Sequence, residues 1–150
     1  MTAAANALGA EQSADRPIPW AVYTFPQVSG VGITQQQAAR EGLPVSIGMF
    51  PVGYLGKAMA VNHTEGFVKV IRHRESDRLL GVHMMGHNAT EAIAAAGAML
   101  GQKATTTDLA ETVFAHPTIA ESLKESAEDA LGMAMHLPPR KVLRVIGDVK

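Results

Sequence analysis

The sequence predicts an α+β fold, in which an antiparallel sheet of four to five strands has helices packed on one face. Three observations lead to this prediction. Short runs rich in β-branched and aromatic residues occupy the first half of the chain. Patterns with helical periodicity fill most of the second half. Strands that come first and helices that follow are typical of an antiparallel sheet covered by helices.

The composition limits the classes of function. At 150 residues, the chain is long enough for one domain with a single core. The net charge of −1 leaves no surplus of cations for phosphates, so we expect no nucleic-acid partner. The absence of cysteine excludes disulfides, thiolate nucleophiles and thiolate-bound metals.

Three parts of the chain are distinguished by composition. Residues 1–16 are polar and rich in alanine, and we expect them to be a poorly ordered leader or the remnant of a preceding domain. They lack the pattern of a signal peptide, and no run reaches the roughly 18 apolar residues that span a bilayer. We therefore expect a cytoplasmic protein without a membrane partner. Residues 17–134 form the domain, and residues 135–150 form a tail that breaks at a diproline and adds an arm or a short strand.

The first elements are short. Residues 20–25 are aromatic and β-branched, which predicts a strand that ends at Pro26. Residues 28–33 contain two glycines and are interpreted as a turn. Thr34 and Gln37 have the spacing of a capping box, which predicts a helix over 34–41.

Three further strands are predicted after this helix. They cover residues 45–52, 66–73 and 79–85, and the last two form a hairpin with a charged connection at 74–78. Residues 54–64, between the first and the second of these three strands, fit either a helical turn or an irregular crossing.

The remaining elements are helical. A small-residue helix is predicted over 89–102, followed by a short helix that starts at Asp108 and runs to Phe114. A last helix is marked by apolar residues along one face, namely Ile119, Leu123, Ala127, Ala130 and Ala134.

The strongest chemical pattern is the segment 115–121, where an imidazole and a carboxylate flank a proline turn. Histidine gains and loses a proton near neutral pH, so His116 suits a general base, and Glu121 suits the group that orients it. Two alternatives compete. His116 is also a plausible helix-entry residue, and Glu121 with Thr118 has the spacing of a capping box. From spacing alone, the cap is the stronger interpretation of Glu121.

Other candidate sites are weaker. His83 and His87 lie four residues apart without a third ligand, so no metal site is predicted, and His83 is interpreted as a hydrogen-bonded sheet residue. His63, His73 and His136 are interpreted as surface groups. Gly30 and Gly32 lack the rest of a nucleotide fingerprint.

Four groups of residues recur in order over about residues 18–133. They are Ile18-Pro19 with Tyr23, Thr24, Pro26 and Val31-Gly32; Phe50-Pro51 with Lys57-Ala58 and Gly66-Phe67-Val68-Lys69; Gly81, His83, Gly86, Ala89 and Glu91; and Ala115-His116-Pro117-Thr118 with Glu121. Together they resemble the C-terminal interface (dimerisation) domain of lipoamide (dihydrolipoyl) dehydrogenase, in the flavoprotein pyridine nucleotide-disulfide oxidoreductase family. Pro26 and Pro117 resemble positions at which that family has cis peptide bonds.

The resemblance implies roles for particular residues. In the family, FAD and NAD domains and a redox-active disulfide precede this region, and the domain at 17–134 would be the homodimer interface. His116 would act as acid–base catalyst in the partner's active site, oriented by Glu121, and His116 and Pro117 would contact the partner's FAD. Glu121 is then expected to contact His116 and to cap the helix as well. Phe114 departs from the histidine that is common two residues before the catalytic one.

Two hypotheses about the chain follow. In the first, it is part of a dihydrolipoyl dehydrogenase-like oxidoreductase and is inactive alone and without bound cofactor. It is then either a piece of a longer protein or a subunit that complements a separate FAD/NAD-domain polypeptide. In the second, it is a free-standing, non-catalytic homodimerisation module derived from that family. The absence of a cysteine pair and of a glycine fingerprint is common to both. Capture of the chain with its partner distinguishes the two hypotheses, because a partner that carries flavin supports the first and a colourless homodimer supports the second.

Overall fold

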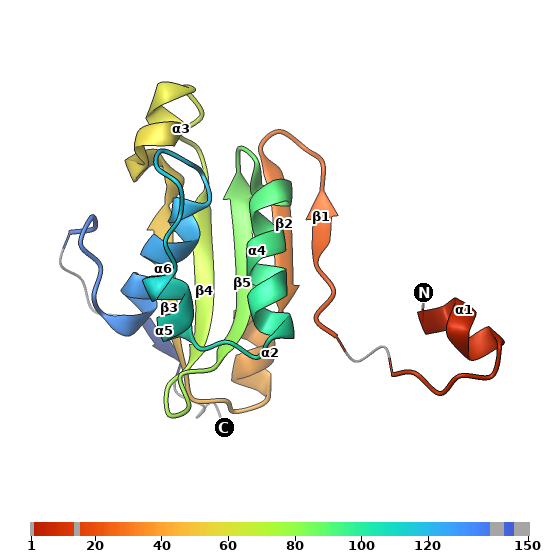
Figure 1. The fold of residues 1–150 in the computed structure, drawn as a ribbon. Coiled ribbons are helices and arrows are strands. Elements are labelled where there is room, and N and C mark those ends of the chain that lie inside the picture. The colour runs from red at the N-terminus through yellow and green to blue at the C-terminus, as the bar shows by residue number, and fades with distance from the viewer. Residues whose placement is uncertain (1, 14–15, 139–142, 146–150) are drawn as a thin grey trace.

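The computed structural model describes residues 2–13, 16–138 and 143–145, and its centre is a six-stranded antiparallel sheet with the order β1-β2-β5-β4-β3-β6 (Figure 1). The strands are β1 (Trp20–Val22), β2 (Gln27–Gly32), β3 (Val45–Pro51), β4 (Phe67–His73), β5 (Leu79–Gly86) and β6 (Leu143–Val145). The helices are α1 (Thr2–Ala7), α2 (Gln35–Arg40), η1 (Val52–Tyr54), α3 (Gly56–Ala60), α4 (Ala89–Gly101), α5 (Thr106–Glu111) and α6 (Glu121–Leu131).

The predicted α+β fold is confirmed. In Figure 1, α4 lies in front of β2 and β5, and α6 lies in front of β3 and β4. The apolar residues of both helices share the main core with these four strands. The sheet has six strands rather than four to five, because β2 joins it where a turn was predicted and β6, within the predicted tail, pairs with residues 45–47 of β3. One helix departs from the one-face arrangement: Ala38 of α2 packs with Val45, Ile47 and Ile71, which belong to a second buried cluster.

The turn predicted over residues 28–33 is wrong, because Gln27–Gly32 form the strand β2. Val28 to Gly32 pair with β5 on one side, and Gly30 also pairs with Trp20 on the other side. The glycine serves a tertiary contact there, since a Cβ on Gly30 would lie 2.4 Å from Nδ1 of His83 and 2.6 Å from the Trp20 ring. The sequence analysis interpreted the glycines as the sign of a turn, whereas Gly30 is needed because His83 and Trp20 pack closely against it.

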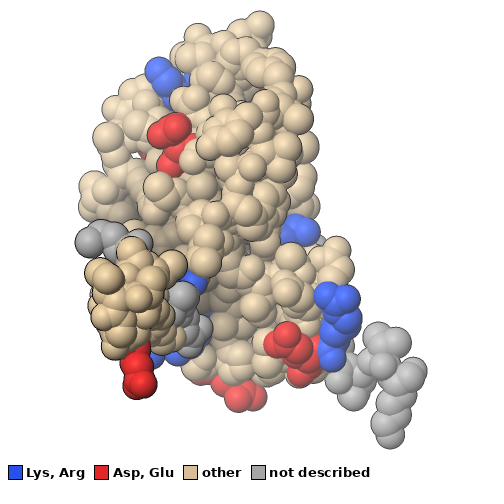
Figure 2. Space-filling model, turned by 90° about the vertical axis from the view of Figure 1, so that its right-hand side faces the viewer, with Lys and Arg blue, Asp and Glu red and all other residues tan. Residues whose placement is uncertain are grey.

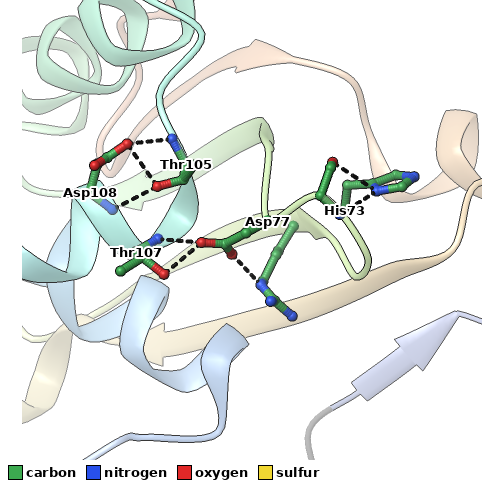
Figure 3. Close-up of polar contacts among 7 residues, drawn as sticks. His73, Asp77, Thr105, Thr107 and Asp108 are labelled. Carbon is green, nitrogen blue, oxygen red and sulfur yellow. Dashed lines mark hydrogen bonds and ion pairs between the residues drawn. The ribbon is translucent and has the colours of Figure 1, made fainter.

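The helix α5 begins earlier than predicted. Thr105 is the N-cap. Asp108, which was predicted to start the helix, is its third residue and forms a capping box with Thr105 (Figure 3). Thr107 donates its backbone N–H to Asp77 in the β4–β5 hairpin, over 3.1 Å, and Arg72 donates to the other oxygen of that carboxylate. Burial raises the pKa of Asp77, but hydrogen bonds from the Thr107 hydroxyl, from Arg72 and from the Thr107 backbone N–H, together with the charge of Arg72, outweigh it and lower the pKa. The hairpin thereby holds α5, which leads into segment 115–121.

The helix α6 lies directly on β3 and β4. The hydroxyl of Ser126 donates to the carbonyl oxygens of Gly48 and Val68, over 3.2 and 3.0 Å. The backbone N–H of Met49 donates to the buried carboxylate of Asp129 over 2.7 Å. These contacts fix the depth and the rotation of α6, and therefore the direction in which its first turns point.

The remaining segments lie around this core. The ambiguous stretch 54–64 contains α3, which stands at the top end of the sheet in Figure 1. None of the residues of α1 described by the structure is buried. Across the described residues, no helix combines the length and the apolar character that crossing a membrane requires.

The close approach of α6 to the sheet leads to a stability prediction. A Cβ on Gly48 would lie 2.0 Å from the Ser126 carbonyl oxygen and 2.5 Å from the Ala130 nitrogen, both backbone atoms. We expect Gly48→Ala to lower the free energy of unfolding by at least about 1–3 kcal/mol, the usual cost of overpacking a core. Urea denaturation measures this loss.

Gly56→Ala is the matched control, because nothing lies within 4 Å of the position of its Cβ. Its effect should stay within about 0.5 kcal/mol, as for most surface changes. Equal stability of the two variants would contradict the described packing of α6.

Candidate functional site

The segment between α5 and α6 places an exposed imidazole beside a half-buried carboxylate. The side chain of His116 is 77% exposed and that of Glu121, the first residue of α6, is 23% exposed. Nδ1 of His116 lies 2.8 Å from Oε1 of Glu121. The predicted contact between these two side chains is therefore confirmed.

The second oxygen of Glu121 fixes the turn. Oε2 accepts the backbone N–H of Thr118 over 2.7 Å, while the Thr118 hydroxyl donates to the Ala115 carbonyl oxygen over 2.8 Å. The predicted capping box is thus only half formed, because the Thr118 hydroxyl does not accept from Glu121, and the helix N-cap is Ala120. The peptide bonds before Pro117 and Pro26 are both cis, as the resemblance implies.

The electrostatics favour an ionised Glu121. Burial raises the pKa of this carboxyl group, but the hydrogen bonds from Thr118 and His116 and the charges of His116 and His136 together lower it below its ordinary value. An ionised carboxylate only accepts hydrogen bonds, so Nδ1 of His116 is the donor. In the neutral ring, Nε2 then carries the free lone pair. This arrangement is suited to accepting a proton at Nε2.

A cavity of about 170 Å³ lies next to this pair. Its lining residues come from β3, η1, α3, α6 and the segments on either side of α6: Phe50, Tyr54, Leu55, Gly56, His116, Glu121, Glu125 and His136. The lining therefore combines aromatic and aliphatic side chains with two imidazoles and two carboxylates.

The sequence analysis did not identify two of these four ionisable residues, Glu125 and His136. His136, which was interpreted as a surface group, places Nδ1 2.7 Å from Oε1 of Glu125. Glu125 is buried, with 9% of its surface exposed. The available signal was the spacing of Glu121 and Glu125, which places both carboxylates on one face of a helix.

Other predicted positions lie away from this site. His83 sits in β5, where Nε2 lies 2.9 Å from the carbonyl oxygen of Ile33, in agreement with its interpretation as a hydrogen-bonded sheet residue. His87 stacks on His63, with ring centroids 4.6 Å apart. Within the part of the chain that the structure describes, no three His, Cys, Asp or Glu side chains converge on a possible metal position.

Comparison with known proteins gives a consistent result. The family model for the dimerisation domain of pyridine nucleotide-disulphide oxidoreductases matches residues 18–127. A dihydrolipoyl dehydrogenase of Thermus scotoductus is 40% identical over 137 residues, which are 91% of this chain and 30% of that protein. A dihydrolipoamide dehydrogenase of Chaetomium thermophilum is 43% identical over 119 residues, which are 79% of this chain and 24% of that protein.

Solved structures show the same likeness. LpdA from Mycobacterium tuberculosis aligns with a TM-score of 0.76 and 25% identity, over 84% of this chain and 28% of that one. The HOCl-induced flavoprotein disulfide reductase RclA from Escherichia coli aligns with a TM-score of 0.75 and 26% identity, over 80% and 28% of the two chains. The chain thus spans less than a third of the length of these relatives.

The state of Glu121 leads to a prediction about pH. Because its pKa is lowered in the folded protein, the stabilisation by Glu121 is present above its ordinary value of about 4.5 and is lost as the pH falls through the folded value. We expect Glu121→Gln to lower the free energy of unfolding at pH 7 by on the order of 1 kcal/mol. The difference from the original protein should shrink towards pH 3.

Urea denaturation across this range measures the difference, with Glu111→Gln on the exposed end of α5 as the matched control. A difference that is the same at pH 7 and pH 3 would show that the charge of Glu121 is not what stabilises the turn.

Proposed function

The chain belongs to the dimerisation-domain family of pyridine nucleotide-disulphide oxidoreductases, and on this premise we propose that it supplies an acid–base pair and a subunit contact to a dihydrolipoyl dehydrogenase-like enzyme. The pair is His116 with Glu121. The observation that carries the proposal is the 2.8 Å contact between Nδ1 of His116 and Oε1 of Glu121, with the rest of the ring exposed.

The chemistry of a dithiol substrate explains why such a pair is useful. A thiol has to lose its proton before its sulfur attacks a disulfide, because the thiolate is the nucleophile. In the proposed step, Nε2 of His116 accepts the thiol proton, and Glu121 stabilises the imidazolium through the hydrogen bond at Nδ1. The reverse transfer returns the proton when a thiol has to form.

The reactive sulfurs have to come from outside this chain, which contains no cysteine. An imidazole that is 77% exposed is accessible to another subunit, and the proposal therefore places His116 at the active site of a partner. We further propose that the exposed Pro117 joins His116 in contact with the partner's flavin.

The cavity beside His116 does not itself fit FAD. The cavity at His116 measures about 170 Å³, below the roughly 300 Å³ at which sites for small ligands usually begin. The sequence also has no glycine-rich phosphate loop. FAD and NAD are accordingly assigned to a separate polypeptide or a further domain, and we expect the isolated chain to be inactive.

Association is supported by apolar side chains near β1. Trp20 and Val22 of β1, and Tyr23 and Phe25 after it, are all exposed. Figure 2 views the molecule from this side and shows large areas without Lys, Arg, Asp or Glu. Exposed apolar patches are typical of surfaces that bind other protein. We propose a cytoplasmic homodimer that holds the flavin-binding polypeptide as well.

Capture of the chain from its native extract tests the proposed function. We expect a co-purifying protein with the visible absorption of a flavin, and oxidation of dihydrolipoamide by the captured complex. His116→Ala should lower this activity by about 10²–10⁴-fold, as for loss of a general base, while assembly is unchanged.

His73→Ala is the control for the histidine change, since His73 lies on the β4–β5 hairpin and bonds to Ser76 (Figure 3). A colourless homodimer would favour the non-catalytic association module instead. Dihydrolipoamide oxidation by the purified chain alone, with FAD, would contradict the proposal.

A further inference from the structure

A second imidazole–carboxylate pair lies beside the first. Nδ1 of His136 is 2.7 Å from Oε1 of Glu125, and the side chain of His136 is 66% exposed. Glu125 lies one helical turn after Glu121 on α6, so the two carboxylates point to the same side of the helix. All four side chains line the cavity of about 170 Å³.

The segment that carries His136 is docked rather than free. Leu137 is partly buried against the main core, and Leu137 and Pro138 line a second small cavity with Met49, Pro51 and Tyr54. Tyr54 lines both cavities. The apolar contacts therefore bring the imidazole of His136 over α6, and the hydrogen bond to Glu125 fixes its position.

The buried carboxylate of Glu125 has one oxygen that the His136 contact does not satisfy. Oε2 of Glu125 is buried and has no hydrogen-bond partner among the described residues. A buried acceptor that is left unpaired destabilises the folded state, so this oxygen calls for an explanation beyond packing. A cavity of this size accommodates water that can bond to such an oxygen.

The charged and titratable groups around His136 come from three elements. Helix α6 contributes Glu121, Glu125 and Glu128, the last with Lys124 at 3.9 Å. Tyr54 comes from η1, and His116 comes from the segment before α6. The pKa of Glu128 is raised, because burial and the charge of Glu125 outweigh the charges of Lys124 and His136, which lower it. The charge of His136 also lowers the pKa of Glu121.

We propose that His136 is a positioning residue of the His116–Glu121 pair, on which it acts through Glu125 and the shared cavity. A positive charge on His136 stabilises the carboxylate form of Glu121, together with the hydrogen bonds from Thr118 and His116, and this carboxylate holds Nδ1 of His116. The two pairs are in this way coupled electrostatically across the shared cavity. The consequence for a dithiol substrate rests on the proposed function, because there the carboxylate of Glu121 stabilises the imidazolium that forms when Nε2 of His116 takes the thiol proton.

Carboxyl-carbon NMR of the full chain tests the coupling directly. The pH titrations of Glu121 and Glu128 are compared in the original protein and in His136→Gln, which keeps a hydrogen-bond donor but has no charge. We expect the pKa of both carboxyl groups to rise in this variant, because a positive charge that lowers each has been removed. In His136→Lys, which restores the charge, both should return towards their original values.

His73→Gln is the matched control, since it makes the same change on the hairpin away from this cavity and should leave both titrations unchanged. The inference is overturned if Glu121 titrates alike in the original protein and in His136→Gln. It is equally overturned if His136→Lys and His136→Gln give the same shift, because a loss of packing rather than of charge would then be responsible.

These outcomes are separate from those of the proposed function, because the titration needs neither a partner nor a flavin. A chain that captures no flavoprotein but shows the coupled titration would contradict the proposed function and leave the role of His136 intact. A captured complex that oxidises dihydrolipoamide, with a Glu121 titration that does not depend on His136, would support the proposed function and contradict the role of His136.

Discussion

The candidate site depends on a single carboxylate that satisfies two groups at once. Glu121 accepts the ring N–H of His116 with one oxygen and the backbone N–H of Thr118 with the other. The same side chain thus orients the imidazole and fixes the turn that carries it. A carboxylate has enough lone pairs for both contacts, so capping and orientation are not alternatives here.

This carboxylate is in place because α6 is held against the sheet. Ser126 bonds to backbone oxygens of two strands, and Asp129 accepts the N–H of Met49 at the adjoining strand position. Gly48 allows the close approach that both contacts require. The position of Glu121 at the surface is therefore a consequence of how α6 packs in the core. His136, from the segment after α6, contacts Glu125 on the same face of the helix.

Local signals in the sequence were sufficient for much of the fold. The capping box of Thr34 with Gln37 and the hairpin formed by β4 and β5 depend on neighbouring residues, and they are present as predicted. Gly30 was misjudged because its requirement comes from His83, which is distant in sequence. Thr105 was missed as a cap because Asp108 also has a helix-start pattern. His136 was missed because docking of the segment after α6, and not any spacing, brings it to Glu125.

The protonated nitrogen of His116 is the most direct test of the account, because orientation by Glu121 requires a hydrogen on Nδ1. Ring ¹⁵N chemical shifts of the neutral imidazole distinguish the two tautomers. We expect the shifts of a protonated Nδ1 and an unprotonated Nε2. A neutral ring with its proton on Nε2 would mean that Glu121 does not hold the imidazole as a base, and would contradict the account.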